Sequence, residues 1–297
     1  MENTEHENKF SNFYNKNYKI LLLIPVVVIV FSFVYLSVFY SSNGDFFNKD
    51  FSLTGGTAVT LIGKIDSQTL ESAVSGKLNE VKTREIYDIS TREQTALVVE
   101  TKDDVEKTKS VLENYLGYKL DENNSSFEFI GSTLGESFYK QLITAILFAF
   151  LFMSLTVFII FRNFVPSLAV IISAFADIIM TLAVVDILGI KISSGGIVAF
   201  LMLIGYSVDT DILLTNRLLK RSEGSINEKL LGAFKTGITM TLTSLLAIIF
   251  ALVISTSFSG LLTQIFTVLA IGLGFDIMNT WITNASILKW HLEKNGK

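Results

Sequence analysis

Long apolar blocks separated by short polar turns make up most of this 297-residue chain. Six blocks are long enough to cross a membrane, because about 20 consecutive apolar residues span the hydrocarbon core of a bilayer. The pattern therefore predicts an α-helical polytopic membrane protein with six transmembrane helices. The predicted spans are Ile20–Tyr40, Leu142–Phe161, Phe164–Leu188, Ile192–Leu219, Thr236–Ser255 and Leu261–Leu288.

The first apolar block is interpreted as a retained membrane anchor. Its apolar core is too long for a secretory signal peptide, and the polar exit SVFYSSNGD offers no small-x-small cleavage site. The chain is therefore expected to keep this span.

Between the first two spans the pattern changes to short stretches of alternating polar and apolar residues, which predict a folded α+β domain. The predicted strands are Thr57–Ile62, Glu85–Ile89, Ala96–Glu100 and Ser126–Ile130, and the predicted helices are Ser67–Asn79, capped by Asp66 or Ser67, and Asp103–Tyr115, led by two aspartates. The resulting βαββαβ order is typical of a ferredoxin-like fold. That fold alone assigns no function, so the domain is either a spacer or a surface that touches cargo or a partner.

Basic residues in short loops predict the orientation of the spans, since such residues stay on the cytoplasmic side. If six helices alternate, one side receives Lys9, Lys16, Lys19, Arg162, Arg217, Lys220, Arg221, Lys229, Lys235, Lys289, Lys294 and Lys297. The expected location is the cell membrane, with both termini cytoplasmic. The predicted parts are a cytoplasmic N-terminus (1–18), a first span (19–40), an extracytoplasmic domain (41–138), a bundle of five spans (139–290) and a cytoplasmic C-terminus (291–297).

The composition supports a membrane protein and excludes several kinds of chemistry. Half of the residues are hydrophobic and 18% are charged, against about 25% in soluble domains. The chain has no cysteine, and its two histidines, His6 and His291, lie at polar termini. Thiol chemistry, histidine metal sites and Ser-His catalysis inside the membrane are therefore not expected, and neither enzymatic activity nor a cofactor or metal is predicted.

Two further classes of ligand leave no trace in the sequence. The phosphate-binding pattern GxxxxGK[ST] does not occur, which argues against ATP hydrolysis. No basic surface with interleaved aromatic residues is evident, so nucleic acid is not an expected partner.

The run GYSVDTDILLTNR, from Gly205 to Arg217, places two carboxylates in an apolar span. Asp209 lies fifteen residues past Ser194, and Asp276 lies fifteen residues past Leu261. Asp177 lies thirteen residues into the third span, so all three are expected at a similar depth near mid-membrane. Carboxylates at this depth are costly and typically mark a proton or ion pathway.

Asp211 is also predicted to take part, but at a separate site from Asp209. Residues two apart on a helix point about 200° away from each other, so we expect one carboxylate to face the third and sixth spans and the other to face a second protein. Arg217 lies about 12 Å beyond Asp209 along the helix. We interpret it as a residue at the cytoplasmic interface that is able to assist proton exit.

The remaining polar and small residues of the spans are interpreted mainly as packing residues. Hydroxyls and amides in membrane helices commonly bond back to the helix or join helices, and glycines permit close helix approach. This set comprises Thr239, Thr241, Thr243, Ser244, Gly272, Gly274, Asn279, Thr280 and Asn284. Asp186, near the outer end of its span, is interpreted as an interfacial residue without a functional role.

Four motifs resemble those of a known family, the SecF proteins of the protein-export machinery, and the wording is closest to archaeal members. DFSLTGGT, with Gly55 and Gly56, resembles the family's DFTGG signature with an insertion, and ADIIMT keeps the aspartate of an HD element as Asp177. GYSVDTDILLTNR matches at Gly205, Tyr206, Ser207, Val208 and Arg217. KTGITMTLTSLLA, which contains Thr241 and Thr243, resembles the RT…TS..T element with lysine for arginine.

The aligned motifs differ in where they put the acid of the fourth span. Bacterial SecF usually reads GYSxNDT, which places the carboxylate at Thr210 in this register. The VDAN element of SecD places it at Asp209. The resemblance therefore leaves open which of Asp209 and Asp211 carries the ion.

The resemblance covers nearly the whole chain and implies an RND-superfamily half unit. It implies pairing with SecD beside a SecYE-type channel, in a lipid membrane, and use of the ion gradient to pull preprotein outward. The main prediction is thus an energy-coupling subunit of protein export that works through Asp209 and Asp211, with protons and sodium both open. The alternatives are a half-size RND exporter of lipids or small amphiphiles, with an apolar conduit, and a non-transporting translocon assembly factor.

Overall fold

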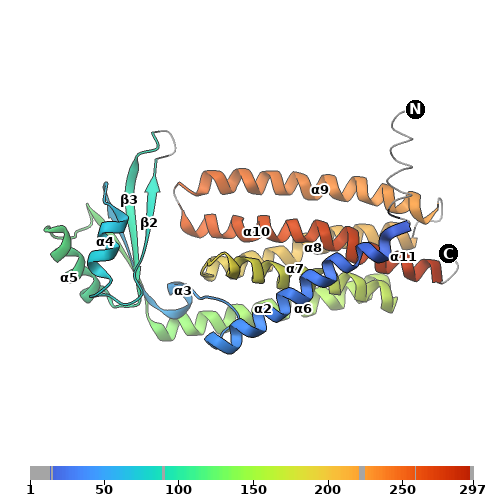
Figure 1. Ribbon diagram of the computed structural model, residues 1–297, viewed down its shortest axis with the longest axis horizontal. Helices are drawn as coiled ribbons and strands as arrows, with labels where there is room; N and C mark the ends of the chain where they lie inside the picture. The colour runs from blue at the N-terminus through green and yellow to red at the C-terminus, as the bar shows by residue number, and fades with distance from the viewer. Residues whose placement is uncertain (1–13, 15, 89–90, 221–224, 258, 295–297) are drawn as a thin grey trace.

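The computed structural model describes residues 14–294 apart from 15, 89–90, 221–224 and 258. A long helical bundle carries a small sheet domain at one end (Figure 1). Within the described residues, six helical stretches are long and apolar enough to cross a membrane, which confirms the predicted number of spans. They are α2 (Leu23–Asn43), α6 (Ser132–Phe161), α7 (Phe164–Ile187), α8 (Ser194–Lys220), α9 (Ile226–Ser255), and the continuous stretch α10 (Gly260–Met278), η1 (Asn279–Asn284) and α11 (Ala285–Lys294).

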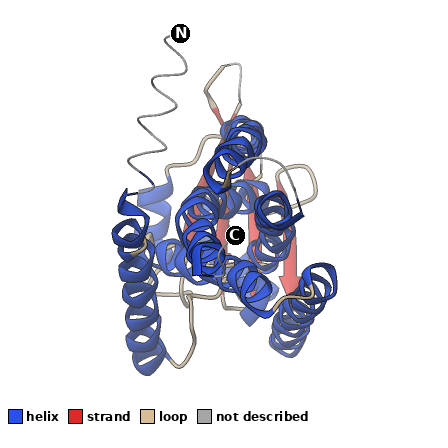
Figure 2. Cartoon of the chain, turned by 90° about the vertical axis from the view of Figure 1, so that its right-hand side faces the viewer, coloured by secondary structure: helices blue, strands red, loops and turns tan. Residues whose placement is uncertain are grey.

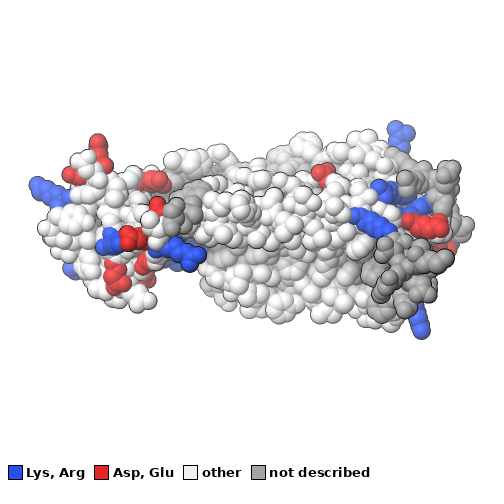
Figure 3. Space-filling view, turned by 90° about the horizontal axis from the view of Figure 1, so that it is seen from above, with Lys and Arg blue, Asp and Glu red and all other residues white. Residues whose placement is uncertain are grey.

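Two helices, α7 and α8, form the centre of the bundle. In their most apolar windows 56% and 50% of the residues are buried, against 17% or less in α2, α6 and α9. Viewed along the bundle, the helices lie in front of the strands of the sheet domain (Figure 2). On the face shown in Figure 3, the long middle part is almost free of charged side chains, which gather at the two ends. This distribution suits a protein surrounded by lipid.

Two spanning helices are longer than the hydropathy pattern predicts. Helix α6 begins at Ser132, ten residues before the expected start, and α9 begins at Ile226, also ten residues early. The α9 start is fixed by a capping box in which Ser225 and Glu228 exchange side-chain to backbone hydrogen bonds. Hydropathy detects only the apolar part of a helix, so polar turns that extend beyond it are missed.

The sheet domain contains β1 (Gly56–Ile62), α4 (Ser67–Val74), β2 (Lys82–Tyr87), β3 (Gln94–Thr101), α5 (Val105–Leu116) and β4 (Ser125–Ile130). The sheet has the strand order β2-β3-β1-β4, and every neighbouring pair is antiparallel. The order of elements along the chain is the one predicted. The expected end of the second strand, Ile89, lies outside the described residues, and α4 ends five residues before Asn79.

Alternation along the strands divides the sheet into two faces. One face packs against α4 and α5 through an apolar cluster whose fully buried members include Val59, Leu61, Leu70, Leu97 and Leu112. The other face carries the intervening residues and faces the bundle (Figure 1). The domain thus has its own core on the side away from the membrane helices.

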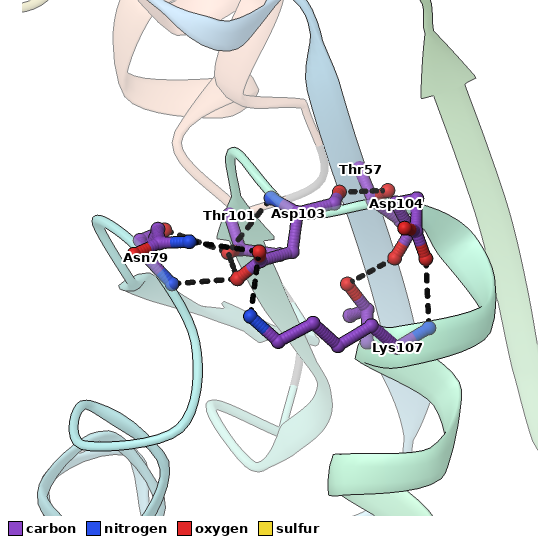
Figure 4. Close-up of polar contacts among 7 residues, drawn as sticks. Thr57, Asn79, Thr101, Asp103, Asp104 and Lys107 are labelled. Atoms are coloured by element: carbon purple, nitrogen blue, oxygen red, sulfur yellow. Dashed lines mark hydrogen bonds and ion pairs between the residues drawn. The ribbon is translucent and has the colours of Figure 1, made fainter.

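Hydrogen bonds join the start of α5 to the sheet and to Asn79 in the loop that follows α4 (Figure 4). The carboxylate of Asp104 caps the helix by accepting from the backbone N–H of Lys107 at 2.8 Å. Asp103 accepts from the backbone N–H of Asn79 at 2.6 Å and from the Lys107 ammonium at 2.8 Å, and its carbonyl accepts from the Thr57 hydroxyl at 2.7 Å. Of the two aspartates predicted to lead this helix, Asp104 therefore caps it and Asp103 links it to neighbouring segments.

Gly55 and Gly56 fix the entry of the chain into the sheet. Gly55 has φ +84°, and a Cβ there would lie 2.5 Å from the Cα of Ser132 at the start of α6. Gly56 has φ +149° and would meet the carbonyl of Thr101 on β3. Both positions therefore need glycine for conformation and for space.

Both described ends of the chain lie at the end of the bundle remote from the sheet domain (Figure 1). Three of the basic residues used to predict orientation, Lys9, Arg221 and Lys297, lie outside the described residues, as does His6.

Candidate functional site

Three carboxylates from three different helices meet inside the bundle. Asp177 of α7 and Asp211 of α8 are 0% exposed, and Asp276 of α10 is 1% exposed. These helices pack against one another, and the three side chains interact electrostatically. The central position of α7 and α8 explains why Asp177 and Asp211 are so completely enclosed.

Asp177 is held by two donors from neighbouring helices. The hydroxyl of Ser207 on α8 donates to its Oδ2 at 2.6 Å, and the Nδ2 of Asn279 donates to its Oδ1 at 2.7 Å. Ser207 belongs to the run that begins at Gly205, so this run supplies a direct partner to the carboxylate of the third span.

Asp276 is bound by two threonine hydroxyls. Thr210 donates to both carboxylate oxygens, at 3.3 and 3.2 Å, and Thr280 donates to Oδ1 at 3.1 Å. Thr210 and Ser207 are three residues apart and share one face of α8. One turn of α8 therefore links Asp177 to Asp276.

Asp211 has the least complete set of partners. The Nδ2 of Asn284 donates to its Oδ1 at 2.8 Å. Its Oδ2 and the Oδ1 of Asn284 are buried and have no hydrogen-bond partner among the described residues. A buried polar atom without a partner is costly, and such atoms often mark a functional position.

A π-helical turn lies in the middle of the sixth span, where it shapes this cluster. The segment η1 covers Asn279–Asn284, between α10 and α11. Hydrogen bonds of the i→i+5 type widen the helix locally and are frequent at functional sites. The turn lets Asn279 reach Asp177 and Asn284 reach Asp211, although the two asparagines are five residues apart.

Apolar layers enclose the carboxylates on both sides along the bundle axis. Towards the sheet domain lie Phe200 and Leu203 of α8 and Leu269 and Leu273 of α10, all buried in one cluster. Towards the chain termini a second cluster includes Leu214, Leu218, Trp281, Leu288 and Leu292. The cluster is therefore closed from both ends in this conformation.

Asp209 lies outside the carboxylate cluster, on the exposed face of α8. The same face carries Met202 and Tyr206, each 40% exposed, and Gly205. Of the two carboxylates in the fourth span, the structure brings only Asp211 together with Asp177 and Asp276.

Arg217 joins α8 to α9 and does not contact the carboxylates through any described hydrogen bond. Its guanidinium donates to the carbonyl of Gly232 and, at 2.9 Å, to the hydroxyl of Thr236. On the same helix Thr241 is buried, whereas the hydroxyl of Thr243 donates to the carbonyl of Thr239.

Asn279, Thr280 and Asn284 donate hydrogen bonds to the carboxylates of the cluster, whereas the sequence led us to interpret them mainly as packing residues. The signal available was their spacing from Asp276: Thr280 follows by four residues, which places it on the same helix face. The π turn that brings Asn284 inward has no simple sequence signature. Among the described residues, no group of three or more acidic, histidine or cysteine side chains is arranged to hold a metal ion.

A second polar feature, a cleft of about 580 Å³, lies between the open face of the sheet and the end of the bundle. Its charged lining residues are Asp50, Lys82, Arg84, Glu100, Glu128 and Lys191. Strand pairing places Lys82 and Glu128 in one row across the sheet with Glu100 and Ala58. Burial, followed by the nearby Asp50 charge, raises the pKa of Glu100 to about 7. Burial also raises the pKa of Asp50.

Comparison with known proteins covers the residues of the carboxylate cluster. The family profile described as "Protein export membrane protein SecD/SecF, C-terminal" matches residues 109–294. A protein-export membrane protein SecF from Methanocaldococcus jannaschii is 38% identical over 282 residues, covering 93% of this chain and 96% of the relative. The SecF of Methanothermobacter thermautotrophicus is 42% identical over 285 residues, covering 94% of each. The chain belongs to the SecF family.

A solved structure supports the same fold. The crystal structure of SecDF from Thermus thermophilus, a translocon-associated membrane protein, superposes on this SecF-family chain with a TM-score of 0.73. The match covers 93% of this chain and 38% of the SecDF chain, at 19% identity. At that identity the likeness concerns the arrangement of membrane helices and small sheet domain. The resemblance in the motifs and the polytopic class are thus confirmed.

Proposed function

We propose that this chain works with a SecD-type partner to couple a transmembrane ion gradient to the outward movement of preprotein through a SecYE-type channel. The proposal follows from family membership, since relatives are named as protein-export membrane proteins. The observation that carries the coupling is the set of three fully enclosed carboxylates on α7, α8 and α10. Three buried negative charges would repel strongly in a medium of low dielectric, so part of the cluster must bind protons or cations.

Asp211 and Asn284 form the element that changes when an ion binds. With Asp211 ionised, one hydrogen bond joins the pair, and the Oδ2 of Asp211 and Oδ1 of Asn284 are left unpaired. A protonated carboxylic acid is also a donor, so its O–H can satisfy the amide oxygen and close a two-bond pair. Loading and release of a proton therefore alter the contact between α8 and the sixth span.

The apolar layers control from which side of the membrane an ion can reach the carboxylates. Ions reach the cluster only when one layer opens, because Phe200 and Leu203 close one side and Leu214 and Leu218 the other. Alternate opening of the layers would move one ion across the bundle for each change of packing. We propose that the sheet domain moves when the packing of α7 against α8 changes.

Asp209 contributes in a different way, at the contact with the partner. An ionisable side chain facing lipid is expensive, so an exposed carboxylate in the middle of a span implies cover by protein. The exposed stripe of Met202, Tyr206 and Asp209 is therefore assigned to the SecD-type partner. Arg217 supports the same helix by its bonds to α9.

The orientation follows from the basic loops, with both termini cytoplasmic and the sheet domain extracytoplasmic. The βαββαβ order and the antiparallel sheet of order β2-β3-β1-β4 support a ferredoxin-like domain, which meets translocating preprotein on emergence. We place this domain within residues 41–138, with its last turns already part of α6. A cleft lined by six charged side chains does not suit an apolar conduit, which disfavours a lipid exporter.

The deciding experiment is an export assay in cells that carry Asp209→Asn together with Asp211→Asn. Gradient-dependent export is expected to fall at least tenfold, while assembly with the partner is followed by co-purification. Glu136→Gln, an exposed acid at the start of α6, is the matched control and keeps full export. Undiminished, gradient-sensitive export in the double variant would overturn ion coupling and favour an assembly role.

A further inference from the structure

Asp186 at the outer end of α7 is enclosed by the chain that leads into the sheet domain. It is 4% exposed, although its position near the end of a span predicted an interfacial side chain. The hydroxyl of Tyr35 on α2 donates to its Oδ2 at 2.8 Å. The backbone N–H and the side-chain Nδ2 of Asn48 donate to its Oδ1 at 3.1 and 3.2 Å. One carboxylate thus binds the first span and the linker that follows it.

The same linker pairs with the turn between α7 and α8. The N–H of Ile192 donates to the carbonyl of Asn48 at 2.7 Å, and the N–H of Asp50 donates to the carbonyl of Ile192 at 3.0 Å. Lys49 and Ile192 form an isolated parallel bridge. The hydroxyl oxygen of Ser52 accepts from the N–H of Ser194, the first residue of α8, at 3.0 Å. Three hydrogen bonds therefore fasten residues 48–52 to the turn between α7 and α8 and to the first residue of α8.

Helix α7 connects this joint to the carboxylate cluster. Asp177 and Asp186 are nine residues apart, which corresponds to about 13 Å along the helix and to opposite faces. Asp177 faces α8 and the sixth span through Ser207 and Asn279, while Asp186 faces α2 and the linker. A displacement of α7 at one site is therefore carried as a rigid element to the other.

The chemistry of the joint requires a carboxylate. All three groups that point at Asp186 are donors, and a carboxylate offers only acceptors. An asparagine at this position would turn one N–H group towards a donor and lose at least one bond. By contrast, Ser32, Ser41 and Asn43 on α2 donate to carbonyls of their own helix, so they do not join α2 to other segments.

We infer that Asp186 is a positioning residue for energy coupling, because it clamps the linker and α2 to α7 and so passes helix movement to the sheet domain. The inference rests on the proposed coupling function. It assigns to Asp186 no ion binding of its own. Its contribution is mechanical and depends on the bonds to Tyr35 and Asn48.

A distance measurement tests the joint directly. The chain has no cysteine, so spin labels attach only at Lys119→Cys, exposed in the sheet domain, and Thr256→Cys, exposed in the turn after α9. The full chain is studied in membranes that contain the SecD-type partner. The label distance is compared with and without Asp211→Asn, which mimics the proton-loaded cluster. We expect Asp211→Asn to change this distance when the joint is intact.

Variants of the joint then separate the outcomes. Asp186→Asn is expected to reduce the response to Asp211→Asn to less than half, and Tyr35→Phe, which removes one hydrogen bond but keeps the ring, to reduce it partly. Asn43→Ala, at the same end of α2, leaves the response unchanged. Export should fall severalfold in Asp186→Asn while partner co-purification stays near that of the parent.

Two results would count against the inference in distinguishable ways. A full response in both Asp186→Asn and Tyr35→Phe overturns the joint and leaves the coupling proposal intact. No response in the parent itself overturns the coupling proposal, and the inference falls with it. If Asp186→Asn does not assemble, Tyr35→Phe alone decides, because a purely structural role predicts an unchanged response in that variant.

Discussion

Asp209 and Asp211 lie two residues apart on α8, and their side chains occupy opposite surroundings. Asp211 is fully buried and accepts a hydrogen bond from Asn284, whereas Asp209 is exposed on the outer face of the helix. The 200° separation expected from helical geometry is thus realised as an inside and an outside position. Substitution of Asp209 and substitution of Asp211 are therefore expected to have different effects on export and on partner binding.

Asp211→Asn should lower gradient-dependent export at least tenfold without loss of the SecD-type partner, because it removes an ionisable member of the enclosed cluster. Asp209→Asn should change export less than twofold per assembled complex but lower the yield of the co-purified partner. Both quantities come from one membrane preparation, by export assay and by affinity purification. The reverse pattern would assign the ion to Asp209.

Asn284→Leu should destabilise the bundle by about 1–3 kcal/mol, because the buried Oδ1 of Asp211 loses its donor. Leucine has a similar size, so the effect reports the hydrogen bond more than a cavity. Thermal unfolding in detergent measures the change. Asn216→Leu, at an exposed position on α8, is the control, and an equal loss in both variants would rule out a special role for the Asp211 pair.

Gly55→Ala should impair folding of the sheet domain onto α6 and lower the free energy of unfolding by more than about 1 kcal/mol. The new Cβ would meet the backbone of Ser132, and the combination of φ +84° and ψ 157° is one that essentially only glycine adopts. Gly117→Ala is the control for a positive φ without a close contact, since Gly117 has φ +76° and ψ 8° with nothing within 4 Å of a built Cβ. The thermal midpoint should fall further in Gly55→Ala than in Gly117→Ala, and equal midpoints would contradict the prediction.

The contact between sheet domain and bundle should weaken as the pH rises from 4.5 to 7, because the pKa of Glu100 is raised from 4.5 to about 7 by burial and by Asp50. A raised carboxylate pKa means that the folded state favours the protonated form, so this contribution is present at low pH and lost as Glu100 ionises. The cations Lys82, Arg84 and Lys191 also face the cleft and limit the loss.

Hydrogen exchange of the open sheet face measures this dependence across the same pH interval. Glu100→Gln should flatten the profile and keep the protected state at the upper end. Glu122→Gln, an exposed acid of the same domain, should leave the profile as it is. If hydrogen exchange in Glu100→Gln kept the same pH dependence, Glu100 would not be the group responsible for it.

The spans and the strand faces were predictable because each depends on a local period. Six apolar blocks are visible without any tertiary information, and the alternation along β1 and β3 already separates Val59 and Val99 from Ala58 and Glu100. The similar depth of Asp177 and Asp276 also followed from counting residues, and both lie in the enclosed cluster.

The inward-facing member of the pair in the fourth span was not predictable. Hydropathy at Asp209 and Asp211 is identical, and their orientation depends on how α8 is rotated against α7 and α10. The same limit applies to Gly272 and Gly274: a Cβ on Gly272 would meet Leu203, whereas Gly274 has open space around it. Asp186 was missed for another reason, since its partners Tyr35 and Asn48 are more than 130 residues away in sequence.

The π turn of the sixth span makes the cluster sensitive to the backbone hydrogen-bond pattern of the helix as well as to its composition. An i→i+5 turn holds one residue more than an α-helical turn, so deleting one residue within η1 would restore a regular α-helix and keep the later residues close to their present phase. If the turn instead became α-helical at its present length, everything after it would rotate by about 100° relative to α10. Asn279 would keep its partner while Asn284 turned away from Asp211. A switch between the π and α forms would therefore misalign the carboxylate cluster without the change of a single side chain.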